Sequence, residues 1–92
     1  MSGWSEDEYV ECLESERRCY AWVMRHYGGL DEPQARAAAE GRYPYEPSSA
    51  PYRGLVFHDE AWTWAMLAIH GDHYWIAHPE LAQPPEAYRA LG

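Results

Sequence analysis

"HDEAWTWAMLAIHGDHYWIAH", residues 58–78, holds the longest nearly apolar run of the chain and the residues that must end it. Residues 61–69 are rich in Ala, Met and Leu, which favour a helix over a strand. Because polar positions are few in this run, we expect a central and mostly buried helix over residues 59–70. Asp59 is the predicted N-cap, and Gly71 can end the helix in the left-handed conformation.

The same stretch allows a second interpretation. Gly71-Asp72 is also a two-residue hairpin turn signal. Residues 65–70 and 73–78 would then pair as antiparallel strands, and the Tyr-Trp-Ile run at 74–76 does favour a strand. The helix is the main prediction, and an α+β fold with a hairpin at 65–78 is its alternative.

A long helix is predicted over residues 5–27. Ser5 and Glu8 form a capping-box pattern at its start, and Trp4 stands where a hydrophobic staple would begin. Gly28-Gly29 is expected to end this helix. One mostly apolar face repeats at three- and four-residue spacing: Tyr9, Cys12, Leu13, Glu16, Tyr20, Val23 and Tyr27.

A shorter helix is expected from about residue 32 to 40, because Asp31 and Gln34 complete a second capping box and Gly41 can end it. "RYPYEPSSAPYRG", residues 42–54, then reads as a loop with three Pro and three Tyr. A loop of this length without regular structure is often functional or packed on the surface, so it is either a packed structural loop or a contact surface.

The C-terminal part of the chain predicts a helical turn over residues 73–77 and a last helix over residues 85–91. Together these elements predict a mainly α fold. The expected architecture is a small helical bundle of about four helices, forming one compact domain over residues 1–92, with the long Pro/Tyr-rich loop at 42–54.

The charge balance limits the partners of the chain. Its cations are 7 Arg and no Lys, set against 15 Asp and Glu, and the net charge is −8. Binding to nucleic acid or to an anionic membrane surface needs many cationic side chains, so we expect neither. No signal-peptide pattern opens the sequence, and the apolar run at 61–69 is far shorter than a membrane span needs. The sequence therefore predicts a soluble cytoplasmic protein.

The two cysteines, Cys12 and Cys19, lie seven residues apart on the predicted first helix. At the rise of a helix their Cα atoms would be about 10.5 Å apart, which is beyond the reach of a disulfide. We expect both to be small buried side chains rather than a bridge or half of a zinc site.

"HGDH", residues 70–73, is the most specific chemical pattern. It resembles the second half of the H-x-H-x-D-H metal motif of the metallo-β-lactamase superfamily. Ala68 stands where the first histidine of that motif belongs, and the two-sheet sandwich of that superfamily needs a much longer chain, so a relationship is rejected. An unrelated metal site, with His58 or His78 as a further ligand, remains an alternative.

That alternative is a small metal- or His-dependent enzyme centred on His70, Asp72 and His73. Against it, His58 and His70 fall at the ends of the predicted helix over residues 59–70, where a histidine often caps the last carbonyls. The sequence contains no G-x-S-x-G, P-loop, G-x-G-x-x-G or H-E-x-x-H pattern. The main prediction is therefore a non-enzymatic protein that needs no metal or other cofactor.

Six acidic residues lie within residues 6–16. On a helix, Asp7, Glu11 and Glu14 form one exposed stripe at i, i+4 and i+7, which Arg18 closes. Such a row of carboxylates can stand in for a nucleic-acid backbone and occupy a basic groove on another protein. The structural alternative is that these acids only favour the helix dipole and keep a small domain soluble.

In size and charge the chain resembles phage-encoded inhibitors of bacterial defence, such as anti-CRISPR and anti-restriction proteins. The resemblance implies a stoichiometric inhibitor or regulator whose partner has a basic, nucleic-acid-binding surface. The predicted contact residues are Asp7, Glu11 and Glu14 of the stripe and Tyr43, Tyr45 and Tyr52 of the loop, because Tyr is enriched at interface hot spots. A homodimer whose aromatic residues cover its own twofold interface is a further possibility.

Overall fold

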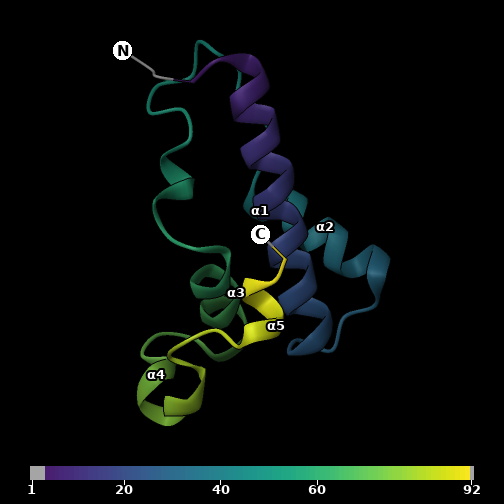
Figure 1. The fold of residues 1–92 in the computed structure, drawn as a ribbon, viewed down its shortest axis with the longest axis vertical. Coiled ribbons are helices and arrows are strands. Elements are labelled where there is room, and N and C mark those ends of the chain that lie inside the picture. Colours follow the sequence, from purple (N-terminus) through teal and green to yellow (C-terminus); the bar gives the residue numbers. More distant parts are fainter. Residues whose placement is uncertain (1–3, 92) are drawn as a thin grey trace.

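The computed structural model describes residues 4–91, and all regular structure in that range is helical (Figure 1). In chain order the elements are α1 (Glu6–His26), α2 (Glu32–Arg42), the 3₁₀-helix η1 (Leu55–His58), α3 (Ala61–His70), α4 (Tyr74–Ala77), the 3₁₀-helix η2 (Pro79–Leu81) and α5 (Glu86–Arg89). The prediction of a mainly α fold is confirmed.

The start of α1 is fixed as the sequence predicts. The Ser5 side chain accepts a hydrogen bond from the backbone N–H of Glu8, and the Glu8 carboxylate accepts one from the backbone N–H of Ser5. Trp4 meets Tyr9 edge-on, with ring centroids 6.4 Å apart, which is the N′ to N4 contact of a hydrophobic staple. At the other end Gly29 adopts φ +74°, and the chain turns away from the helix.

The core forms where α1 lies between α2 and α3 (Figure 1). α2 contributes the small buried residues Ala35 and Ala39, which let its backbone approach α1 closely. Trp62, almost fully buried, donates its Nε1–H to the carbonyl of Leu81 at 2.9 Å. The main buried side chains of α1 and α3 are Tyr9, Leu13, Cys19, Tyr20, Val23, Ala61, Trp62, Ala65 and Met66.

The alternative hairpin at 65–78 does not form. α3 runs through His70, its C-cap Gly71 has φ +82° and ψ −173°, and the chain then enters the single helical turn of α4. Ala61, Ala65 and Met66 face the core together with Trp62, a spacing that only a helix brings to one side. Gly71 therefore ends a helix and does not turn a hairpin.

Two predicted helix boundaries are wrong. α3 begins at Ala61 and its N-cap is Glu60, which makes no side-chain cap hydrogen bond, so Asp59 does not cap it. The preceding η1, absent from the prediction, places Asp59 at its own end. α2 continues through Gly41 to Arg42, whose guanidinium lies 4.1 Å from the centroid of the Trp64 ring. A tertiary cation–π contact therefore holds the last turn that Gly41 was predicted to end.

The loop that follows α2 is tied down at both ends. Arg17 of α1 donates two hydrogen bonds to the carbonyl of Tyr43, at 2.9 and 2.7 Å. Near the other end the Arg53 side chain is only 2% exposed, and its Nε–H reaches the carbonyl of Glu46. The Glu46 carboxylate in turn accepts the backbone N–H of Gly54 at 3.0 Å. The loop is thus part of the packed structure.

α1 is the only described helix of more than 18 residues, and it carries many charges. Within residues 4–91 no helix is both long enough and apolar enough to cross a membrane.

Candidate protein-interaction surface

The predicted acidic stripe lies on the solvent side of α1. Asp7, Glu11 and Glu14 are all exposed, on the side of the helix opposite its buried residues. Among residues 4–91 none of the three carboxylates makes an ion pair or a side-chain hydrogen bond. Like charges four residues apart on a helix repel one another, so Asp7 and Glu11 raise the free energy of the uncovered surface. A cationic partner would relieve that repulsion.

The neighbouring acids have structural roles. Glu6 accepts a hydrogen bond from the Tyr45 hydroxyl at 2.6 Å and pairs with Arg53 at 2.7 Å. These bonds, from Tyr45 first and Arg53 next, lower the pKa of Glu6 below its ordinary value. The pKa of Glu8 is lowered by its hydrogen bonds with Ser5. The carboxylates available to a partner at the start of α1 are therefore those of the stripe.

The three tyrosines predicted as contacts lie in three different environments. Tyr43 is fully buried, against Tyr20 and Phe57, so its prediction as a contact residue is wrong. Its ring fills the core because Arg17 holds its carbonyl against α1. Tyr45 is half exposed but its hydroxyl is occupied by Glu6. Tyr52 is 81% exposed at φ +57°, so it alone of the three presents a whole ring to solvent.

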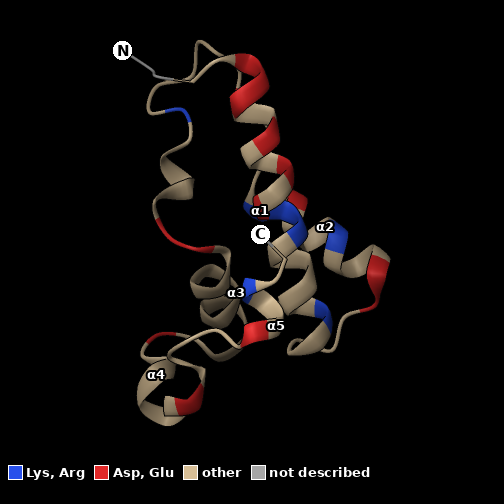
Figure 2. Ribbon diagram, viewed as in Figure 1, with Lys and Arg blue, Asp and Glu red and all other residues tan. Residues whose placement is uncertain are grey.

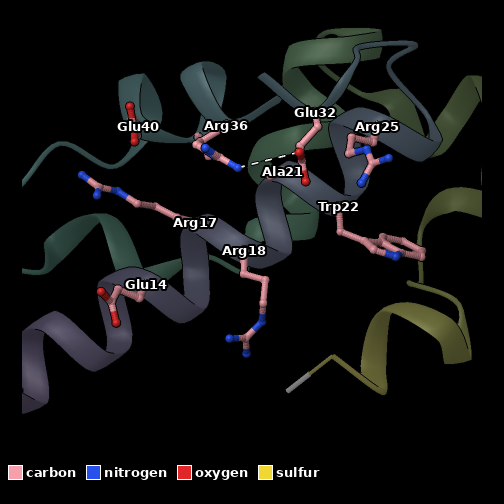
Figure 3. A pocket seen from close by; sticks show the side chains of 10 residues that line it. Glu14, Arg17, Arg18, Ala21, Trp22, Arg25, Glu32, Arg36 and Glu40 are labelled. Carbon is pink, nitrogen blue, oxygen red and sulfur yellow. Dashed lines mark ion pairs between the residues drawn. The ribbon is translucent and has the colours of Figure 1, made fainter. Parts of the chain in front are cut away.

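A groove between α1 and α2 brings together cations that the sequence separates. It has a volume of about 560 Å³, and Figure 3 shows its lining side chains. Trp22 and Ala21 of α1 supply its apolar part, and Arg36 forms an ion pair with Glu32 at 3.8 Å along α2. The charged lining residues are Arg17, Arg18, Arg25, Arg36, Glu14, Glu32 and Glu40.

This groove could not be predicted from the sequence, because its residues come from two helices. Only the packing of α2 beside the C-terminal part of α1 makes them neighbours (Figure 1). One signal was present in the sequence: all six acids of α1 precede Arg17, and its arginines follow. Figure 2 shows the resulting division, with acidic residues along the N-terminal half of α1 and basic residues further along it. α1 is therefore a helix with two oppositely charged halves.

A second hollow, of about 400 Å³, lies beside α1 on another side. Glu16 and Glu60 both line it, and burial together with the charge of Glu60 raises the pKa of Glu16. Burial, reinforced by Glu16, also raises the pKa of the thiols of Cys12 and Cys19. Both cysteines are free thiols, and a raised pKa lowers the fraction of reactive thiolate.

The histidine cluster of the sequence is not assembled around Asp72. His70 lies against His78, with ring centroids 4.4 Å apart, whereas His73 lies against Trp75 at 5.3 Å. His73 has φ +61°, which turns the chain between α3 and α4. Over residues 4–91 no group of three or more His, Cys, Asp or Glu side chains is placed to hold a metal ion. The structure thus does not bring His70, Asp72 and His73 together as a site.

No protein-family model, curated protein or solved structure matches this chain.

Proposed function

We propose that the protein is a non-enzymatic interaction protein that binds a partner with a basic surface through the acidic stripe of α1. The observation that carries the proposal is the state of Asp7, Glu11 and Glu14, which are exposed, aligned and without a cationic partner among the described residues. A cationic groove on another protein satisfies all three carboxylates at once and removes their mutual repulsion.

The stripe supports one kind of partner in particular. Its three carboxylates follow one another at a rise of about 4.5 to 6 Å along a rigid helix, so they present a line of negative charge. A groove that binds a nucleic-acid backbone is built to accept such a line. The proposed activity is stoichiometric inhibition or regulation of a nucleic-acid-binding protein, as in anti-CRISPR or anti-restriction proteins, and Tyr52 adds an exposed ring beyond the stripe.

The test compares three forms of the protein as bait in cells that carry its gene. The first is wild type, and the second reverses the stripe with Asp7→Lys, Glu11→Lys and Glu14→Lys. The third is a matched control with the same change in net charge, Asp72→Lys, Glu80→Lys and Glu86→Lys, made at exposed acids outside α1. A specific partner must be retained by wild type and by the control and lost with the reversed stripe.

A second measurement tests whether the partner is a nucleic-acid-binding protein. Nucleic acid added to the complex should displace the protein, and the protein should inhibit nucleic-acid binding by the partner at equimolar amounts. A partner that binds the reversed stripe as well as the wild type, or that binds nucleic acid and this protein together, contradicts the proposal.

A further inference from the structure

The solvent side of α1 carries a regular row of positions along nearly its whole length. Residues 7, 11, 14, 18, 21 and 25 follow one another in alternating steps of four and three. This spacing keeps all six positions on one side of the helix along its length. In chain order the row reads Asp, Glu, Glu, Arg, Ala, Arg, so its first half is negative and its second half positive.

We propose that this row binds the same row of a second copy, antiparallel and about a twofold axis at the level of residue 16. In that register residue i lies opposite residue 32 − i of the other chain. Glu14 then faces Arg18 of the second copy, and Asp7 faces its Arg25. The remaining acid, Glu11, faces Ala21, which is small enough to leave room for it.

The charges select this arrangement over its alternative. Each of the two kinds of ion pair occurs twice, because a twofold interface repeats every contact. No charged residue of the row faces a residue of the same charge in the second copy. In a parallel pair every charged position would face its own copy, which places Asp7 on Asp7 and Arg25 on Arg25. Like charges opposite one another across an interface are strongly unfavourable.

The structure leaves this face open for a second helix. The positions of the row are exposed apart from the half-buried Ala21. Four of them line the groove that α2 borders (Figure 3): Glu14, Arg18, Ala21 and Arg25. Arg25 has no ion pair or side-chain hydrogen bond within residues 4–91. Arg18 uses one guanidinium nitrogen on the carbonyl of Leu91, at 3.2 Å, and its other N–H groups are available.

α2 adds contacts at the edge of the pair, because it borders the groove that part of the row lines. The acidic half of the second copy would run along the arginine-rich half of the first, beside Arg17 and Arg36. Two carboxylates of α2 also line the groove, and one of them, Glu32, is held by Arg36. Glu40 has no such ion pair among the described residues, so it would repel an incoming carboxylate. The pair is therefore expected to be reversible and sensitive to salt.

This inference deepens the proposed function, because the same stripe serves both. Asp7 and Glu14 cannot face a second copy and a basic partner at the same time, so self-association would hold the stripe covered until a partner competes for it. The arginine half of the row is needed only for self-association, and that difference separates the two hypotheses by experiment.

The test is the mass of the protein in solution, by sedimentation equilibrium over a concentration series. The full chain has a mass of 10.7 kDa, and we expect a species of twice that mass at low salt. Raising NaCl from about 50 to about 500 mM should raise the dissociation constant of the dimer at least about tenfold, because exposed ion pairs are screened. A chain that is monomeric at every concentration overturns the inference, and so does a dimer that does not respond to salt.

Charge reversal tests the register itself. Arg18→Glu with Arg25→Glu should give a monomer, and so should Asp7→Arg with Glu14→Arg. Mixing these two monomers should give a mixed dimer, and placing all four changes in one chain should restore the homodimer, because every pair is then inverted. The mixed dimer shows only that opposite charges attract, so the fourfold variant decides the register. If that variant keeps its helical circular dichroism and does not associate, the register is refuted.

A matched single change separates the effect of the row from the effect of the net charge of the chain. Arg25→Glu removes two pairs by symmetry and should weaken the dimer at least about tenfold, whereas Arg89→Glu makes the same charge change at an exposed site of α5 and should leave it unchanged. Equal effects of the two changes overturn the inference. Because the Arg18→Glu, Arg25→Glu variant keeps the whole acidic stripe, its binding to a basic partner reports on the proposed function independently.

Discussion

Arg53 reaches across from the loop to the first turn of α1, where its Nη2 lies 2.7 Å from Glu6 Oε1. The Arg53 side chain is almost fully buried, whereas that of Glu6 is about half exposed. The guanidinium also lies 3.9 Å from the centroid of the Tyr9 ring. One loop cation thus holds the loop, the start of α1 and an aromatic core residue together.

Arg53→Met should destabilise the fold clearly. Met keeps the apolar stem over Tyr9 but leaves the Glu46 carbonyl and Oε1 of Glu6 without the Arg53 donor, so that among the described residues Glu6 retains only its hydrogen bond from Tyr45. Arg36→Met is the control, since Arg36 and Glu32 form an exposed i, i+4 pair of little worth. In thermal unfolding, Arg53→Met should lower the melting temperature much more than Arg36→Met. Equal decreases would contradict the role of Arg53 in holding the loop to α1.

Gly54→Ala should destabilise the fold more than replacement of a glycine that has only a positive φ. Gly54 has φ +84°, and a Cβ there would lie 2.5 Å from Trp4 Nε1. Gly29 has a similar φ of +74° but open space around it, so Gly29→Ala measures backbone strain alone, about 1 kcal/mol. We expect Gly54→Ala to lose more than about 2 kcal/mol in urea unfolding, because a clash with Trp4 is added to that strain.

The buried hydroxyl of Tyr43 has no hydrogen-bond partner within the described residues. Burial raises the pKa of Tyr43 far above its ordinary value, so the ring stays neutral. Tyr43→Phe should therefore be neutral or stabilising by up to about 1 kcal/mol. Tyr9→Phe is the matched contrast: the Tyr9 hydroxyl accepts the backbone N–H of Glu46 at 2.7 Å, and its loss should cost about 1 kcal/mol or more. Urea unfolding of both variants should show opposite signs.

Met66 of α3 is fully buried in the core. Met66→Ala should lose about 2 to 5 kcal/mol, as is usual when a large core side chain is truncated. Ile76→Ala removes a similar apolar side chain at a position that is 71% exposed, and it should change the stability by less than about 0.5 kcal/mol. If the two variants unfold alike, α3 does not pack as described.

Glu16 gives the fold a pH dependence of defined sign. Burial and the neighbouring Glu60 raise the pKa of Glu16 in the folded state above its unfolded value. A group of this kind contributes stability at a pH below its unfolded pKa, and that contribution is lost as the pH rises through the folded pKa. Ionisation of this partly buried carboxyl, at a pH above its folded pKa, therefore costs stability.

Glu16→Gln should accordingly raise the melting temperature at pH 7, and the gain should shrink as the pH falls below about 4.5, where the wild-type carboxyl is itself protonated. Glu14→Gln removes the same charge from the exposed stripe and serves as the control. A gain for Glu16→Gln that is the same at pH 4 and pH 7 would argue against a strained carboxylate.

The sequence alone determined the local features whose physics lies within a few residues. The capping boxes at Ser5 and Asp31 form as predicted, because each needs only a side chain and a backbone N–H three residues apart. The Trp4 staple on Tyr9 follows for the same reason. The acidic stripe was predictable because helical periodicity places Asp7, Glu11 and Glu14 on one side whatever else packs nearby.

Tertiary structure decided the features that depend on contacts between distant residues. Tyr43 looked like an exposed loop residue, but Arg17, 26 positions earlier in the chain, holds its carbonyl and directs its ring into the core. Arg42 extends α2 past Gly41 because Trp64 lies beneath it. The arginine-lined groove exists only because α2 packs beside α1, since no pattern within either helix specifies how two surfaces will meet.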